Sequence, residues 1–162
     1  MESPVKTLVY GYGNPGRGDD GLGPALVEKI QAWIVENNVL GVDTDSNYQL
    51  NIEDAYNIKD YDIVIFADAS CEDIEHFIIE RVKPDEKTAF NTHSVSAGFV
   101  LNLCNNMYGK KPLVFLLHLR GYDFGLKEGF SDLADSTLNM AYNYLVNIIA
   151  TPRLSKLLES VK

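Results

Sequence analysis

The sequence predicts an α/β sandwich, in which helices cover both faces of a mainly parallel sheet. Short apolar runs alternate along the chain with segments whose apolar residues recur at helical spacing, and strands that alternate with helices form parallel sheets. The strongest run, at 61–67, is apolar on both faces, as in a central strand. The length of 162 residues and the hydrophobic share of 46% suit one core, so we expect a single domain over residues 1–162.

The expected elements follow from the positions of apolar runs and of helix-breaking residues. Strands are expected at 6–12, 39–48, 61–67, 77–82 and 113–119, and helices at 24–37, 51–58, 94–108 and 132–150. Pro24 suits a first helical turn, because its missing N–H leaves no hydrogen bond unmade there. Gly109 is expected to end the third helix and Pro152 the fourth. Apolar residues at helical spacing mark the expected inward faces, namely Val95, Phe99, Leu103 and Met107 in the third helix and Leu133, Leu138, Tyr142, Leu145 and Ile149 in the fourth.

The composition argues against several classes of protein. A net charge of -9 disfavours binding to nucleic acid, whose phosphates an acidic surface repels. No apolar run approaches the roughly 18 residues of a membrane-spanning helix, and the polar first residues do not resemble a signal peptide. We therefore expect no membrane partner and a cytoplasmic location. Cys71 and Cys104 lack a Cys-x-x-Cys spacing and are expected to be reduced, structural thiols.

The polar residues that follow the strands indicate where a ligand binds. In a parallel sheet, ligands bind outside the carboxyl ends of the strands, which here are followed by 14–21, 68–71 and 120–122. The loop at 92–94, before the third helix, can reach the same edge. Asp20, Asp68 and His93 in these segments offer two oxygens and one nitrogen to a borderline divalent metal. The sequence thus predicts that these three side chains share one site.

The glycine-rich segment 11–23, GYGNPGRGDDGLG, allows two interpretations. Residues 11–16 match the dinucleotide fingerprint Gly-x-Gly-x-x-Gly, whose last glycine lies at the start of a helix. Here seven residues, 17–23, separate Gly16 from the expected helix, and two of them are aspartates that repel a phosphate. The favoured interpretation is a loop that displays a carboxylate, with one of Asp19 and Asp20 bracing the loop and the other facing a ligand.

Each of these residues also has a purely structural explanation. A turn or a helix N-cap accounts for Asp19 about equally well, and a solvated loop is the usual setting for a histidine such as His93. His76 and His118 are expected to be structural. Ser70, Ser94 and Cys71 lie near the predicted site, but none has an evident base partner in the sequence, so no separate nucleophile is assigned.

Three motifs resemble those of the hydrogenase maturation endopeptidases, the nickel-dependent processing proteases of [NiFe] hydrogenases. A strand followed by Gly-x-Gly-Asn, two acidic residues and Gly-x-Gly matches 11–23. An apolar strand that ends in Asp-Ala matches 63–69, and a Thr or Ser beside a His ahead of a helix matches 92–94. The length and the order of elements fit over nearly the whole chain.

The resemblance implies both a fold and an activity. The implied fold is a five-stranded twisted sheet between helices, of the phosphorylase/hydrolase type, and the implied metal-binding and catalytic residues are Asp20, Asp68 and His93. The implied reaction removes the C-terminal extension from the hydrogenase large-subunit precursor after nickel insertion. The nickel belongs to the precursor and is the recognition signal, so the protease is expected to hold no permanent metal.

Two segments depart from the family pattern. Many family members carry Gly-Gly-Thr or Gly-Gly-Ser where this chain has residues 45–55, and the pattern Tyr-Gln-Leu-x-x-Glu-Asp at 48–54 resembles the branch that processes soluble, pyridine-nucleotide-linked hydrogenases. The loop at 120–130 is individual to this chain and is expected to contact the tail of the precursor. Two other functions stay open: a metal-dependent binding or checkpoint protein that cuts nothing, and a nucleotide-binding α/β domain.

Overall fold

The computed structural model describes residues 4–87, 95–151, 154–159 and 161–162. Over these residues, the strands are β1 (Thr7–Tyr12), β2 (Val42–Asn47), β3 (Ile63–Ser70), β4 (Phe77–Arg81) and β5 (Leu113–Arg120). The helices are α1 (Leu22–Asn37), α2 (Asp54–Ile58), α3 (Ala97–Tyr108), α4 (Asp132–Ile149) and α5 (Leu154–Glu159), and a 3-10 turn, η1 (Gly18–Gly21), precedes α1.

The strands form one sheet in the order β2-β1-β3-β5-β4. β1 pairs in parallel with β2 and β3, and β3 pairs in parallel with β5. β4 is antiparallel to β5 at one edge of the sheet. The predicted five-stranded, mainly parallel sheet is therefore confirmed.

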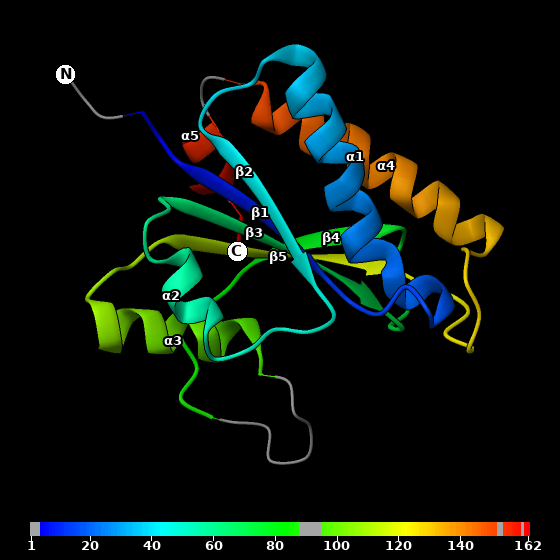
Figure 1. Cartoon of the computed structure of the whole chain (residues 1–162), viewed down its shortest axis with the longest axis horizontal. Helices are drawn as coiled ribbons and strands as arrows, with labels where there is room; N and C mark the ends of the chain where they lie inside the picture. Colours follow the sequence, from blue (N-terminus) through cyan, green and yellow to red (C-terminus); the bar gives the residue numbers. More distant parts are fainter. Residues whose placement is uncertain (1–3, 88–94, 152–153, 160) are drawn as a thin grey trace.

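Helices cover both faces of this sheet, as Figure 1 shows: α1 and α4 lie on one side, and α2 and α3 on the other. The apolar run of β3 explains this arrangement, because successive side chains of a strand point to opposite faces. Ile63 and Ile65 belong to the core beneath α1 and α4, whereas Val64 and Phe66 belong to the core beneath α2 and α3. A strand that is apolar on both faces needs a helical layer on each of them, as predicted.

The start of α3 differs from the prediction. Ser96 is the N-cap, and its Oγ accepts a hydrogen bond from the Phe99 N–H at 3.1 Å, so the helix begins at Ala97 and not at residue 94. Gly109 ends α3 with a φ of 64°, as predicted.

The predicted inward faces of α3 and α4 are partly wrong. Met107 is 64% exposed, and Leu133 of α4 is 58% exposed. In α3, a different row of side chains, shifted around the helix axis, packs on the sheet. Both this row and the predicted one have helical spacing in the sequence. The rotation of the helix against the sheet decides between them. The buried residues of α3 are Ala97, Val100, Leu101 and Cys104.

Two further observations concern membrane-spanning helices and the cysteines. No helix among the described residues combines the length and the apolar content needed to cross a bilayer. Cys71 is an exposed free thiol and Cys104 is a buried one. The prediction that both cysteines are unpaired is thus confirmed.

Candidate functional site

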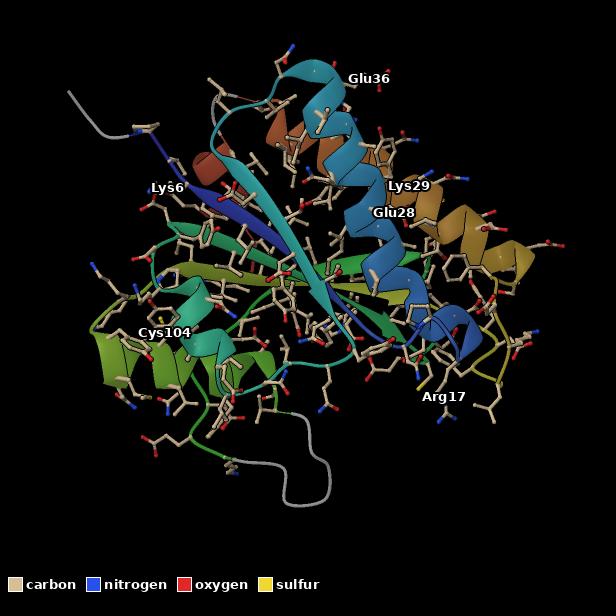
Figure 2. All side chains as sticks on the ribbon, viewed as in Figure 1. Lys6, Arg17, Glu28, Lys29, Glu36 and Cys104 are labelled. Carbon is tan, nitrogen blue, oxygen red and sulfur yellow. The ribbon has the colours of Figure 1, made fainter. Side chains whose placement is uncertain are left out.

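The segments predicted to meet at the carboxyl ends of the strands do lie together. The Gly121 N–H, after β5, donates to the Ser70 carbonyl at the end of β3 at 2.9 Å. The Asp19 N–H, in the loop after β1, donates to the Asp123 carbonyl at 2.8 Å. In Figure 2, Arg17 marks this loop, beyond the carboxyl end of β1. The rule for parallel sheets therefore predicted this edge correctly.

Asp19 is the residue that braces the loop. Its side chain is fully buried, and its Oδ2 accepts hydrogen bonds from the N–H groups of Tyr122 and Asp123 at 2.7 and 2.9 Å. Ser131 donates its N–H to Oδ1 at 2.9 Å and its Oγ–H to Oδ2 at 2.7 Å. Ser131 is also the N-cap of α4, so this single carboxylate ties the loop after β1 to the loop before α4.

These hydrogen bonds keep Asp19 ionised. Burial by itself raises the pKa of a carboxyl, but the donors around Asp19 favour the charged form, and the net result is a lowered pKa. Asp19 is fully buried and does not line the pocket that contains Asp20 and Asp68. Asp19 is therefore a structural residue. It is the one of the two aspartates that braces the loop, as expected for a loop that displays a carboxylate.

Asp20 is the residue that faces a hollow. Its Oδ2 accepts a hydrogen bond from the Asn14 N–H at 2.8 Å, which fixes the side chain across the loop. The half-buried carboxyl lines a pocket of about 510 Å³ together with Asp68. The structure thus brings together two of the three predicted site residues.

Gly13 allows this placement of Asp20. A Cβ on Gly13 would lie 2.0 Å from the Asp20 carbonyl oxygen, and the φ of 145° also disfavours any residue with a side chain. Gly16 lies in an exposed turn, where its N–H donates to Asn14 Oδ1 at 2.9 Å. η1 separates Gly16 from α1, so no helix N-terminus meets the last glycine of the dinucleotide fingerprint.

Asp68 lies near the carboxyl end of β3 on the same face as Phe66, toward α2 and α3. Burial, and then the charge of Asp20, raise the pKa of Asp68 to about 7. Hydrogen bonds from the Ala69 N–H and the Tyr12 hydroxyl act in the opposite direction, because both favour the charged carboxylate. The two carboxyls are therefore close enough to repel each other, and a cation between them would relieve that repulsion.

Tyr12 is a residue of the pocket that the sequence interpretation did not single out. Its hydroxyl hydrogen-bonds to Asp68, and its ring packs against Tyr10 and Phe66 at centroid distances of 6.5 and 6.1 Å. Burial and the charge of Asp68 raise the pKa of this hydroxyl, so it remains a donor. The sequence offered one clue, which is position. Gly11 of β1 is paired with Ala67 of β3, so the next residues on the two strands, Tyr12 and Asp68, lie side by side.

His93, the third predicted ligand, lies outside the described residues, as do Thr92 and Ser94. The described chain resumes at Val95, and Val95, Ser96 and Ala97 line the same pocket as Asp20 and Asp68. No group of three or more His, Cys, Asp or Glu side chains suited to a metal occurs among the residues that the structure describes. The three-ligand site stays a prediction.

Two other polar residues considered in the sequence, His118 and Ser70, have structural partners. His118 Nε2 lies 2.8 Å from Glu80 Oε1 and so joins β5 to β4. Ser70 Oγ accepts the Glu72 N–H at 3.2 Å. Both contacts are structural, and no base for a serine or cysteine nucleophile is evident beside Ser70 or Cys71 in the described chain.

The segment that departs from the family pattern, 45–55, forms one wall of the pocket. Leu50 is 1% exposed and lines the pocket beside Tyr48. Asp54 accepts the Asn51 N–H at 2.8 Å and an Asn57 side-chain N–H at 3.0 Å, which stabilises the start of α2. The pocket is thus built from the loop after β1, the end of β3, this segment and the start of α3.

Comparison with known proteins leads to one group of enzymes. No protein-family model matches the sequence. A curated protein of Methanocaldococcus jannaschii, provisionally named a hydrogenase maturation protease, is 26% identical over 153 residues, covering 88% of this chain and 95% of that protein.

Solved structures with this fold carry related names. The hydrogenase maturating endopeptidase HybD from E. coli matches with a TM-score of 0.70 at 18% identity, covering 88% of this chain and 91% of that chain. The [NiFe] hydrogenase maturation protease HycI from Thermococcus kodakarensis matches with a TM-score of 0.65 at 22% identity, covering 91% and 94%. The resemblance predicted from the motifs is confirmed: this chain is similar in sequence to a protein named as a hydrogenase maturation protease, and it shares its fold with solved hydrogenase maturation proteases, which are peptidases.

Proposed function

We propose that this protein is a cytoplasmic endopeptidase that removes the C-terminal extension from the large-subunit precursor of a [NiFe] hydrogenase after nickel insertion. The observation that carries the proposal is the pairing of Asp20 and Asp68 in one pocket at the carboxyl edge of the sheet. The relatives in sequence and fold supply the reaction class.

In this proposal the nickel is part of the substrate, and the protein recognises the precursor by binding it. Asp20 and Asp68, with His93 as the third ligand, bind a nickel ion that the precursor already holds. Burial, and then the charge of Asp20, raise the pKa of Asp68, and two neighbouring carboxylates form a site that favours a cation. The protein itself is proposed to hold no permanent metal.

Binding in this way positions the scissile bond next to the pocket. Holding the bond in one orientation lowers the entropic part of the barrier. Bound nickel supplies polarisation of a carbonyl or of a water. The residues of this chain orient the ion: Asn14 fixes Asp20, and Tyr12 fixes Asp68.

The direct test compares nickel-loaded with nickel-free precursor. Purified protein is mixed with each form, and the mass of the large subunit is measured over time. We expect a shortened subunit only from the nickel-loaded form. Equal cleavage of both forms contradicts nickel recognition, and a stable complex without any shortening supports the checkpoint function instead.

Substitution of the proposed ligands distinguishes residues that are needed for processing from residues that are needed for folding. Asp68→Ala and His93→Ala are expected to abolish processing while the circular dichroism spectrum stays that of the wild type. Unfolded variants would show that these side chains are structural. Ser70→Ala serves as a matched control near the end of the same strand, and its processing rate is expected to stay within about twofold of wild type, since Ser70 Oγ only accepts a local N–H.

A further inference from the structure

β2 is an edge strand whose outer side is open. It pairs with β1 only, among the residues that the structure describes. In Figure 1, β2 crosses in front of β1, and α1 lies beside it. An open edge presents backbone donors and acceptors to which another extended chain can pair.

The register shows which backbone groups are open. Gly41 and Asn47 direct their carbonyls toward β1, where they accept the N–H groups of Thr7 at 2.8 Å and Gly13 at 3.1 Å. Since the backbone groups of successive residues in a strand point to opposite sides, residues 41, 43, 45 and 47 face β1, and Thr44 directs its N–H and C=O away from β1. The Thr44 N–H has no hydrogen-bond acceptor among the described residues.

The neighbouring outward N–H is already occupied. Asp45 Oδ1 accepts the N–H of Ser46 at 2.8 Å. The unpaired backbone N–H and C=O at the middle of β2 are therefore those of Thr44. The Thr44 side chain is held to α1 by a hydrogen bond between Oγ1 and Gln31 Oε1.

Three adjacent hollows, together called the groove here, link this edge to the candidate site. A hollow of about 650 Å³ lies between α1 and β2 and is lined by Thr44 and Ser46. A smaller hollow of about 240 Å³ shares Ser46 with it and shares Tyr48 with the pocket of Asp20 and Asp68. The groove thus passes around the carboxyl end of β2 from one face of the sheet to the other.

The distances suit a short extended peptide. Asn47 of β2 is paired with Tyr12 of β1, and Tyr12 hydrogen-bonds to Asp68 of β3. Neighbouring strands are about 4.8 Å apart, so the end of β2 at Asn47 lies about 10 Å from Asp68, which about three extended residues span. Thr44 lies three residues earlier in β2, so about three more extended residues bring the peptide beside it. A chain whose scissile bond lies at Asp68 therefore reaches β2 with the residues next to that bond.

The walls of the groove restrict the side chains of that peptide. Glu28 and Asp45 are the charged residues that line the hollow beside β2. Pro24 and Phe130 provide apolar surface in the same hollow. A segment with neutral or basic side chains fits this surface, and an acidic segment is repelled.

We infer that the precursor binds by strand addition, with the extended segment next to the scissile bond lying in this groove and pairing with the Thr44 backbone. The inference rests on the proposed endopeptidase function and specifies how the substrate is held. Backbone pairing supplies affinity without requiring particular side chains, while the carboxylates of the groove select against acidic tails.

The test compares Thr44→Pro with Thr44→Val in processing of the nickel-loaded precursor. Both variants lose the hydroxyl that contacts Gln31, but only proline removes the outward N–H. Proline is tolerated at an edge position whose N–H faces away from the sheet. We expect KM to rise by about tenfold or more for Thr44→Pro and to change less than about twofold for Thr44→Val. A folded Thr44→Pro protein with the KM of the wild type overturns the inference.

Amide exchange of the wild-type protein supplies a test that does not depend on a variant. Addition of nickel-loaded precursor, with exchange sampled before the precursor is shortened, is expected to slow exchange of the Thr44 N–H by about tenfold or more, as backbone pairing on that side requires. The Asp43 N–H, which points toward β1, is the internal control and should not change. Protection of Thr44 that depends on protein concentration and not on precursor assigns the edge to a second copy of this chain and overturns the inference.

The two proposals fail in different ways. Wild-type protein that never shortens the nickel-loaded precursor contradicts the endopeptidase, even if Thr44 becomes protected. Normal shortening with unchanged Thr44 exchange contradicts strand addition and leaves the endopeptidase intact.

Discussion

The neighbouring carboxylates of Asp19 and Asp20 have entirely different partners. Asp19 accepts four hydrogen bonds from Tyr122, Asp123 and Ser131, across the molecule. Asp20 accepts one from Asn14 within its own loop and faces the pocket of Asp68. One residue of the pair therefore holds the loop to the scaffold, and the other is free to meet a ligand.

Asp19→Asn is expected to destabilise the fold by about 3 kcal/mol, because an amide cannot accept all four hydrogen bonds and leaves a buried donor unpaired. Urea unfolding at pH 7 measures the loss. Asp123→Asn is the control, since among the described residues the exposed Asp123 carboxylate pairs only with Lys127 and the Gly125 N–H, and its midpoint should stay near that of wild type. Equal midpoints for Asp19→Asn and wild type would contradict the brace.

The same brace predicts a loss of stability in acid. The folded state lowers the pKa of Asp19, so its contribution is complete above the unfolded pKa of about 3.9 and is lost as pH falls through the lower folded value. Below about pH 4, the difference in midpoint between wild type and Asp19→Asn should therefore shrink. A difference that stays constant between pH 7 and pH 2 argues against this assignment.

Gly13→Ala is expected to reduce processing strongly and to destabilise the fold by on the order of 3 kcal/mol. The new methyl group would collide with the Asp20 carbonyl, which is backbone and can yield only by moving η1. Gly16→Ala is the control in the same loop, because its added carbon meets only the Asn14 side chain at 3.2 Å. Processing rates and thermal midpoints of both variants check this. If the loop bound a dinucleotide, Gly16→Ala would instead be the more damaging substitution.

Asp68→Asn is expected to abolish processing and yet to stabilise the protein at neutral pH. Because folding raises the pKa of Asp68 to about 7, the folded state binds more protons than the unfolded state between about pH 4 and 7. Stability of the wild type therefore falls across that window as pH rises. The variant, which does not titrate, should gain at most about 4 kcal/mol at pH 8 and nothing at pH 4. A wild-type advantage at pH 8 would contradict the raised pKa.

Tyr12→Phe is expected to lower the processing rate by about fivefold to tenfold, because it removes one hydrogen bond to the charged form of Asp68. The phenyl ring keeps the contacts with Tyr10 and Phe66, so the thermal midpoint should change little. The pKa of Asp68 should rise further above about 7, since the Tyr12 hydroxyl lowers it. Carbon-13 NMR of the Asp68 carboxyl follows this titration, and an unchanged value would mean that Tyr12 is structural only.

Local patterns were sufficient for the elements of the fold. The strand at 61–67, apolar on both faces, predicted the central β3 and the two helical layers that bury its alternate side chains. The glycines around Asp19 and Asp20 predicted a carboxylate-displaying loop after β1. These features depend on neighbours a few residues away, so the order of residue types along the chain specifies them.

The placement of individual side chains required long-range contacts. The donors to Asp19 lie 103 to 112 residues further along the chain, and no local pattern decides whether Asp19 or Asp20 meets them. The buried stripe of α3 and the contact of Tyr12 with Asp68 also depend on how separate elements pack.

The sequence by itself determined the parallel α/β architecture and the three motifs that contain Asp20, Asp68 and His93, because strand and helix periods and glycine conformations are local properties. Only the tertiary structure decided that Asp20 and not Asp19 faces the pocket, and that Tyr12 holds Asp68. Hydrogen bonds and burial join residues that are distant in the chain, and their energies exist only once the elements have packed.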